Sequence, residues 1–388
     1  MKILIAPDSF KGSLSAMEAA RAMKKGFGEV FPQAEFRLAP IADGGEGTVE
    51  ALTAATGGRI NEEIVSDPLG RPVQAHWGLL GGGEAVVEMA AASGLPLLTE
   101  NERDPRLTSS RGTGQLVAAA LNRLHFGPDV GRRPRLIIGL GGSATNDGGA
   151  GCLEALGLRF LDDQGRELSP GGAALAGLAA IDTSGLNPLL NKTDILVACD
   201  VDNPLCGPRG ASAVFGPQKG ATPEMVRELD AALEQFARVA SAASGRESDR
   251  EPGAGAAGGL GAGLLFFTGA RLRPGIDIVL EAIGLEAQCA WADLVLTGEG
   301  RTDFQTAFGK APVGVAHIAK KIGRPVICLS GALGEGAEDI LDHGVDALSG
   351  AVASVMTLDD CLSQADHLLT RAAARAARLL LLGRGLSD

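Results

Sequence analysis

The stretch Gly139-Leu-Gly-Gly-Ser-Ala-Thr-Asn-Asp-Gly-Gly-Ala-Gly151 follows the apolar run Leu136-Ile-Ile138 directly. The apolar run predicts a buried strand, and the glycines predict a tight turn into the next element. Ligands of α/β proteins bind where strands end, and glycine lets backbone N–H groups approach a ligand closely. The stretch therefore predicts an α/β fold and places a ligand site within it.

Two shorter stretches have the same character and also follow apolar runs. They are Asp43-Gly-Gly-Glu-Gly47 and Thr297-Gly-Glu-Gly-Arg-Thr-Asp303. Glycine turns favour anions, while the acids and hydroxyls supply metal ligands and hydrogen bonds. This combination suits a phosphorylated ligand with a divalent ion.

Glycine could serve geometry alone in the longest stretch. A turn that only reverses the chain does not need Ser143, Thr145, Asn146 and Asp147 together, so we favour a phosphate cradle with a carboxylate at its rim.

The order of expected elements predicts two domains in the 388 residues. Strands alternate with helices over 1–66 and 285–388, while residues 59–89 show short alternating runs typical of antiparallel strands. We expect an α/β fold with one discontinuous Rossmann-like parallel sheet, formed by 1–66 and 285–388. A mixed α/β domain of residues 67–284 is inserted into it, with the active site in the cleft between them. Residues 245–263 mix charges with glycine and alanine, which predicts a mobile connector or hinge.

Composition narrows the classes of partner. Lys and Arg number 35 against 47 Asp and Glu, a net charge of −12, which argues against nucleic acid and anionic membranes as partners. No apolar stretch reaches the ~18 residues of a membrane span, and no signal peptide is recognisable. The six cysteines form no CxxC pair. We therefore expect a cytoplasmic protein with reduced cysteines.

Three further segments carry candidate site residues, each with a simpler alternative. The loop Asp8-Ser-Phe-Lys-Gly-Ser13 offers Lys11 to a carboxylate or phosphate, or it is a turn with a solvated lysine. Arg301 is either a bidentate anion ligand or half of a surface ion pair. In Asp200-Val-Asp-Asn-Pro204 a carboxylate could hold Mg²⁺, or these are turn residues. Lys219, in Gly216-Pro-Gln-Lys-Gly220, is a weaker signal, with a solvated side chain as the alternative.

Two rival functions lack their sequence features. The pattern GxGxxG of a nicotinamide-dependent oxidoreductase is not met, since Ala144 stands where the third glycine belongs. A non-catalytic anion-binding protein would have cations in its clefts without several acids beside them, and this chain has the opposite. The strict P-loop pattern is also absent.

Several motifs, in order along nearly the whole chain, resemble the bacterial glycerate kinase family of type I, the glycerate 2-kinases. They are 6–14 (APDSFKGSL), 42–48 (ADGGEGT), 112–115 (GTGQ), 141–149 (GGSATNDGG), 216–221 (GPQKGA) and 297–303 (TGEGRTD). The resemblance implies ATP-dependent phosphorylation of (R)-glycerate in glycolate, glyoxylate or aldarate breakdown. The product it implies is 2-phosphoglycerate, with 3-phosphoglycerate left open.

Roles for these positions are our inference within that resemblance. Glycerate and the moving phosphoryl group would meet Lys11 and Arg301, with Asp8, Ser9 and Asp303 lining the substrate site. Asp147 or Asp43 would accept the hydroxyl proton, and Asp200 and Glu299 would hold Mg²⁺. The ATP phosphates would lie on Thr113, Gly141, Gly142, Ser143, Thr145 and Asn146. The oligomeric state is left open, with a homodimer as the candidate.

Overall fold

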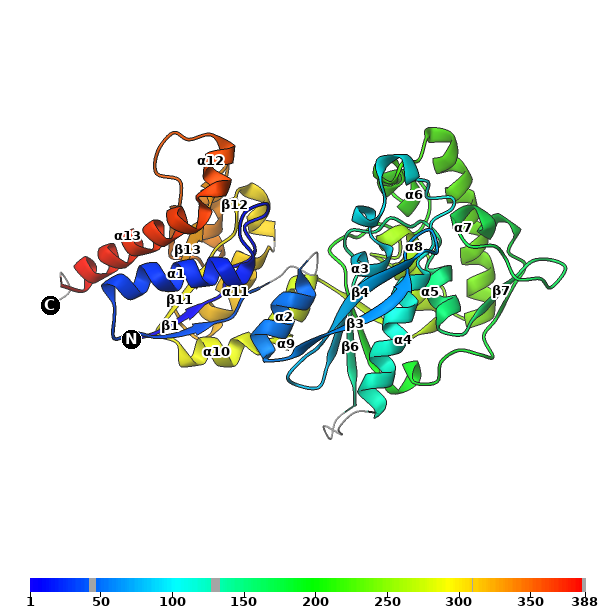
Figure 1. Cartoon of the computed structure of the whole chain (residues 1–388), viewed down its shortest axis with the longest axis horizontal. Helices are drawn as coiled ribbons and strands as arrows, with labels where there is room; N and C mark the ends of the chain where they lie inside the picture. The colour runs from blue at the N-terminus through cyan, green and yellow to red at the C-terminus, as the bar shows by residue number, and fades with distance from the viewer. Residues whose placement is uncertain (42–46, 127–132, 309, 386–388) are drawn as a thin grey trace. The chain divides into compact units, whose positions relative to one another are not determined.

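The computed structural model describes residues 1–41, 47–126, 133–308 and 310–385 (Figure 1). The chain divides into two compact units, and each is described by itself. The first unit comprises Met1–Asp43, Ala54–Thr56 and Ile276–Asp388, and the second comprises Gly44–Thr53 and Gly57–Gly275.

The first unit is built on a five-stranded sheet in which every pairing is parallel. Its order is β15-β13-β11-β1-β2, with β1 Lys2–Ile5, β2 Glu35–Leu38, β11 Leu294–Thr297, β13 Val326–Ser330 and β15 Ala347–Gly350. Counted along the chain, these five strands lie in the order 2-1-3-4-5 of a doubly wound fold. The order reverses between β1 and β11, and such a switch point is where ligands bind in this class of sheet.

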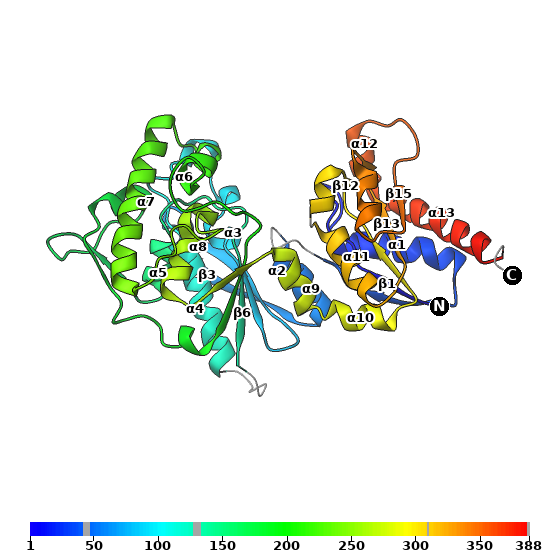
Figure 2. The same cartoon turned by 180° about the vertical axis from the view of Figure 1, so that it is seen from behind.

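Helices cover both faces of this sheet. Ile3 and Ile5 share a core with residues of α1 and α13, while Leu4, which points to the opposite face, is equally buried. α10 and α11 contact the sheet as well (Figure 2). The helices and short strands of this unit are α1 Ala16–Val30, α9 Gly275–Ala282, α10 Leu285–Trp291, β12 Arg301–Thr302, α11 Ala311–Lys321, β14 Ala332–Leu333, α12 Leu358–Ser363 and α13 Ala365–Gly385.

The second unit has a mixed sheet of six strands, in the order β10-β9-β6-β5-β4-β3. The four from β10 to β5 run parallel, and β4 and β3 add an antiparallel hairpin. The strands are β3 Arg59–Ser66, β4 Pro72–Leu79, β5 Ala85–Glu88, β6 Arg135–Gly139, β9 Asp194–Ala198 and β10 Arg271–Arg273; β7 Arg159–Leu161 and β8 Ala180–Asp182 pair separately. The expected antiparallel segment at 59–89 is thus confirmed.

Helices of the second unit contribute to two hydrophobic cores of its described residues. α4 and α8 contribute to the core around the sheet, and α7 and α8 contribute to the second core. Their bounds are α2 Thr48–Thr56, α3 Ala90–Ser93, α4 Arg111–Phe126, α5 Ala150–Ala155, α6 Ala211–Phe215, α7 Pro223–Ser244 and α8 Ala256–Phe267. No helix of the described residues is both long and apolar enough to cross a membrane.

The structure corrects one expectation and shifts two boundaries. The predicted connector at 245–263 is wrong for its second half, because α8 is buried along its whole length. The observed unit boundaries differ from the predicted ones, 1–66 and 67–284. The first shifts because β3 pairs with β4 from Arg59 to Ser66 and so belongs to the second unit. The second shifts because the second unit ends at Gly275.

Candidate functional site

The switch point of the first unit brings together two of the predicted site segments. The Asp8 backbone N–H donates to Gly298 O at 2.8 Å, and the Thr297 hydroxyl donates to Ala6 O at 2.9 Å. Gly300 lies so close to the other loop that a Cβ built on it would be 3.2 Å from Lys11 N. The loops after β1 and β11 therefore lie side by side, with Lys11 and Ser9 exposed on one and Arg301 exposed on the other.

Glu299 is the buried acid of this switch point. Its Oε1 accepts hydrogen bonds from the hydroxyls of Thr306 at 2.7 Å and Thr302 at 3.2 Å. Burial raises the pKa of Glu299, and these hydroxyls and the charge of Lys310 oppose the rise. Oε2 accepts no hydrogen bond from the described residues, so it remains available to a ligand.

Arg301 is held only loosely. Its Nε lies 3.5 Å from Asp303 Oδ2, and its side chain is 67% exposed. Exposed pairs of this kind contribute little to stability, so the guanidinium can turn to an anion at small cost. Asp303 is less exposed and also accepts the Gln305 N–H at 3.0 Å.

The glycine stretch of the second unit lies at the carboxyl end of β6. Among the hydrogen bonds that fix its backbone, Leu95 N–H donates to Gly142 O and Ala144 N–H donates to Ser93 O, both at 2.9 Å. The N–H groups of Gly141 and Gly142 donate no hydrogen bond within the described part of the chain, and both residues are exposed. Two adjacent free N–H groups at a strand end can bind a phosphate.

The other predicted phosphate ligands are buried side chains that hold the glycine stretch in shape. Ser143, Thr145 and Asn146 are buried, and the Asn146 amide donates to Ser212 Oγ at 2.9 Å. Thr113 is also buried and donates to Ser93 Oγ at 2.8 Å. These side chains therefore shape the turn, while its backbone at Gly141 and Gly142 faces outward.

Asp147 is fully buried and both of its oxygens accept hydrogen bonds. Oδ2 accepts from Ser110 N at 2.8 Å, Ser110 Oγ at 2.9 Å and Gly151 N at 3.2 Å, and Oδ1 accepts from Gly149 N at 3.2 Å. Burial raises its pKa, and the bonds from Ser110 and the glycines oppose the rise. These contacts favour a carboxylate that holds the turn together.

Two further residues lie beside this turn: Lys219, which the sequence indicated only weakly, and Glu88, which the sequence analysis missed. The Lys219 ammonium is buried and donates to Thr145 O at 2.6 Å and Ser143 Oγ at 3.2 Å. Glu88, the last residue of β5, accepts the Val49 N–H at the start of α2 at 2.7 Å. The glycines flanking Lys219 were the available signal for its burial.

The two predicted metal ligands, Asp200 and Glu299, belong to different units. Asp200 follows β9 in the second unit and accepts the Gly275 N–H at 2.8 Å, whereas Glu299 belongs to the first unit. Asp43 lies outside the described residues. Within the described ranges, no three His, Cys, Asp or Glu side chains form a group that could hold a metal ion.

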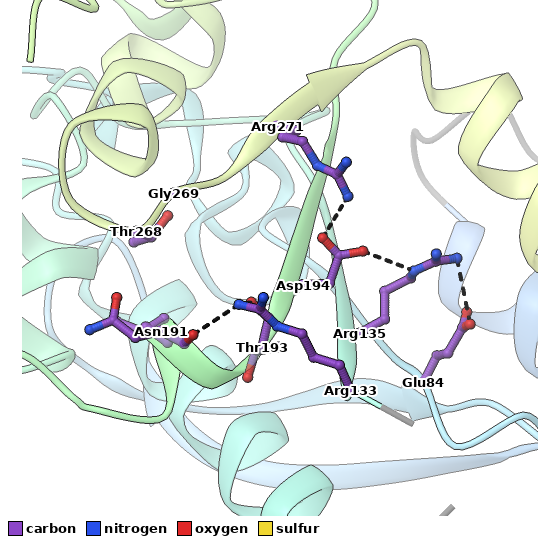
Figure 3. Close-up of a pocket in the computed structure, with 10 residues that line it drawn as sticks. Glu84, Arg133, Arg135, Asn191, Thr193, Asp194, Thr268, Gly269 and Arg271 are labelled. Atoms are coloured by element: carbon purple, nitrogen blue, oxygen red, sulfur yellow. Dashed lines mark hydrogen bonds and ion pairs between the residues drawn. The ribbon is translucent and has the colours of Figure 1, made fainter. Parts of the chain in front are cut away.

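A cavity of about 670 Å³ lies in the second unit where the parallel strands of its sheet begin, opposite to the strand ends that precede the glycine stretch (Figure 3). Arg135, Asp194 and Arg271 begin β6, β9 and β10, and all three line it. Asp194 pairs with Arg271 at 2.6 Å and with Arg135 at 3.4 Å, while Arg135 also faces Glu84 at 3.6 Å. Arg135 and Arg271 thus face acids, while Arg133 donates to the carbonyls of Asn191 and Thr193. The cavity lies away from the strand ends that carry the candidate site.

Taken together, these observations define an α/β protein with exposed cations on strand-end loops of its first unit and an exposed glycine turn at a strand end of its second unit. The family model of the glycerate kinase family matches residues 3–381. The chain therefore belongs to the glycerate kinase family.

Similar proteins cover the same length. The chain is 52% identical over 385 residues to the glycerate kinase of Bacillus subtilis (strain 168), with 99% of each chain covered. It is 49% identical over 384 residues to the glycerate 2-kinase of Escherichia coli (strain K12), again with 99% of each covered. A crystal structure named for glycerate kinase 2 of Salmonella typhimurium LT2 matches with a TM-score of 0.89 at 49% identity, covering 99% of both chains.

Proposed function

We propose that this protein is a kinase that transfers the γ-phosphoryl group of ATP to (R)-glycerate. The observation that carries the proposal is the family match over residues 3–381, and relatives named glycerate kinase support it at about half identical residues. We propose 2-phosphoglycerate as the product, on the similarity to a glycerate 2-kinase, with 3-phosphoglycerate as the alternative.

The residues at the switch point fit the acceptor. Glycerate carries one carboxylate, and Lys11 and Arg301 present two exposed cations at the edge where ligands of doubly wound sheets bind. Arginine binds carboxylates and phosphates bidentately, so Arg301 would orient glycerate or the moving phosphoryl group. Asp8, Ser9 and Asp303 lie on the same two loops and would line this site.

The turn after β6 fits the phosphates of ATP. Its outward N–H groups at Gly141 and Gly142 would bind phosphate oxygens, with Ser143, Thr145, Asn146 and Thr113 keeping the turn in shape. Phosphoryl transfer needs position and charge neutralisation more than covalent help. That the active site lies between the two units stays a prediction.

A proton must leave the glycerate hydroxyl during transfer. Asp147 and Asp43 are the two candidates, and Asp147 already uses both oxygens as acceptors of four hydrogen bonds. We therefore propose Asp43 as the acceptor, which predicts an inactive but folded Asp43→Asn variant.

We also propose a Mg²⁺ requirement, with Asp200 and Glu299 as ligands. Glu299 Oε2 is open to a ligand, and Mg²⁺ in kinases takes one or two carboxylates together with phosphate oxygens and water. The ion would neutralise charge on the phosphates. A homodimer and a cytoplasmic location stay predictions.

A coupled assay of ADP release with (R)-glycerate, (S)-glycerate and glycolate tests the proposal, followed by identification of the product by NMR. We expect turnover with (R)-glycerate that EDTA abolishes and added Mg²⁺ restores. No ADP release above the background with (R)-glycerate would refute the activity, and full turnover in EDTA would refute the metal requirement alone.

A further inference from the structure

Lys219 is a buried lysine to which the proposed reaction gives no role. It ends the short 3₁₀ turn Pro217–Lys219 and is 2% exposed. The next residue, Gly220, has φ +94°, and a Cβ there would lie 2.3 Å from Arg103 O. The backbone at Gly220 therefore packs tightly against Arg103, and the Lys219 side chain is enclosed within the second unit.

The ammonium group of Lys219 contacts the glycine stretch. Its Nζ donates to Thr145 O at 2.6 Å and to Ser143 Oγ at 3.2 Å. Among the described residues no acid lies within ion-pair distance of Nζ, and Asp147 is the charged group that acts on it from further away. Burial lowers the pKa of Lys219 to about 7, and the negative charge of Asp147 opposes this fall.

A buried ammonium without a counter-ion is unfavourable in the protein alone. Its unfavourable energy decreases when an anion binds nearby, because attraction between charges is strong where water is excluded. The free N–H groups of Gly141 and Gly142 lie on the same turn, two residues or fewer before Ser143. Lys219 is thus a positive charge directly behind a phosphate-binding turn.

We propose that Lys219 is a positioning residue for ATP: it fixes the Ser143–Thr145 segment and supplies the positive charge that stabilises phosphates bound at Gly141 and Gly142. The inference rests on the assignment of this turn to ATP in the proposed function. Lys219 acts through the turn, because two of its three N–H donors bind Ser143 Oγ and Thr145 O.

ATP binding should also change the protonation of Lys219. An anion bound beside Lys219 favours its charged form, so ATP binding at pH 8 should take up protons from solution. Two acids could also respond: burial raises the pKa of Asp147, and it raises the pKa of Glu88 to about 7. Comparison with variants of Lys219 separates their contribution.

The main test measures binding of ATP and of adenosine by calorimetry, without glycerate, for the wild type, Lys219→Met and Lys192→Met. Lys192 is an exposed lysine of the same unit and serves as the matched control. We expect Lys219→Met to bind ATP at least tenfold more weakly with adenosine affinity unchanged, and Lys192→Met to behave as wild type. In turnover, KM for ATP should rise while KM for glycerate stays within twofold.

Unchanged ATP affinity in Lys219→Met would overturn the proposal, as would equal losses for ATP and adenosine, which indicate a merely structural lysine. If Lys219→Met fails to fold, Lys219→Arg keeps the charge but cannot release its proton at pH 8. It should bind ATP without the proton uptake of the wild type, and undiminished uptake would contradict the proposal. Because these readouts need no glycerate, a wild type that binds ATP but leaves glycerate unchanged would refute only the proposed function.

Discussion

Asp147 shows how a single carboxylate can organise a binding turn. It links the start of α4, through Ser110, to the start of α5, through Gly151. Gly151 has no space for a side chain, since a Cβ there would lie 2.1 Å from Ser109 Oγ. The turn is thus closed around the carboxylate, which leaves Asp147 no path to a substrate hydroxyl.

Replacing Asp147 by Asn should therefore cost stability. The amide keeps one acceptor oxygen but places an NH₂ group against N–H donors, so buried hydrogen bonds to a charged group are lost. We expect the free energy of unfolding to fall by about 2 kcal/mol. Urea denaturation measures this, with the exposed Asp163→Asn of the same unit as control. A hundredfold loss of kcat at unchanged stability would instead return Asp147 to the role of base.

Arg301 is the residue whose role depends most on its shape. Arg301→Lys keeps the charge but loses the planar fork, so kcat/KM should fall by about tenfold or more, equivalent to roughly 1.4 kcal/mol. The melting temperature should stay unchanged because the side chain is mostly exposed. Steady-state kinetics checks this, with Arg371→Lys on α13 as control. Wild-type kinetics in Arg301→Lys would indicate a surface ion pair.

At the scale of elements, the backbone N–H groups at the start of α2 donate to a buried carboxylate. Glu88 accepts hydrogen bonds from the backbone N–H groups of Gly47, Thr48 and Val49. A negative charge at a helix N-terminus is favourable. Burial nevertheless dominates and raises the pKa of Glu88 from its ordinary value of 4.5 to about 7, with the charge of Glu50 adding to the rise.

This pKa predicts a pH dependence of stability. Between about pH 4.5 and 7 the folded protein holds a proton on Glu88 that the unfolded chain releases, so the contribution of Glu88 to stability decreases as pH rises through this range. Glu88→Gln removes this dependence. Urea denaturation at pH 5.0 and 7.5 should show the wild type losing stability relative to Glu88→Gln, whereas Glu100→Gln, an exposed control, should follow the wild type. Parallel behaviour of Glu88→Gln and wild type would contradict the shifted pKa.

The elements that were predictable from sequence are those with local signals. Leu136–Ile138 and Leu294–Leu296 are short apolar runs, followed by Gly139 and by Thr297-Gly298, and both lie in strands that end at candidate site segments. α8 was missed because its alanines and glycines resemble a linker. Its burial depends on a distant contact: Gly258, with φ +67°, packs so closely on the glycine stretch that a Cβ would lie 2.0 Å from Thr145 O.

Contacts between residues distant in sequence also decided the roles within the candidate site. The roles of Lys219 and Asp147 depend on partners 76 and 37 residues away, and no spacing in the sequence indicates which donors meet which acceptors. Residue types predicted an anion site and its approximate segments. The fold alone decides which side chains face a ligand and which hold the backbone.

At the scale of the whole molecule, the first unit is assembled from both ends of the chain. α1 packs on α13, and their closest approach is at Gly26, where a Cβ would lie 2.2 Å from Thr370 O and 2.7 Å from Ala373 Cβ. β1 likewise pairs with β11. The integrity of this unit therefore depends on segments that are far apart in sequence.

Gly26→Ala should push these two helices apart and destabilise the first unit by about 2 kcal/mol, as overpacked cores do. Gly28, two residues further on the same helix, has open space around its Cβ position. Gly28→Ala should thus stabilise by up to about 1 kcal/mol through helix propensity. Chemical denaturation of both variants measures the difference. Equal effects of the two substitutions would show that the helices do not meet at Gly26.

The pairing of β1 with β11 also has a consequence during synthesis on the ribosome. The Thr297 hydroxyl donates to Ala6 O across 291 residues, so β1 and α1 emerge long before β11 and α13 exist. At about 5–20 residues per second, this interval is roughly 15–60 s. The second unit can fold as it emerges, while the apolar residues of β1 and α1 stay exposed, so the nascent chain offers chaperones a binding segment at its leading end.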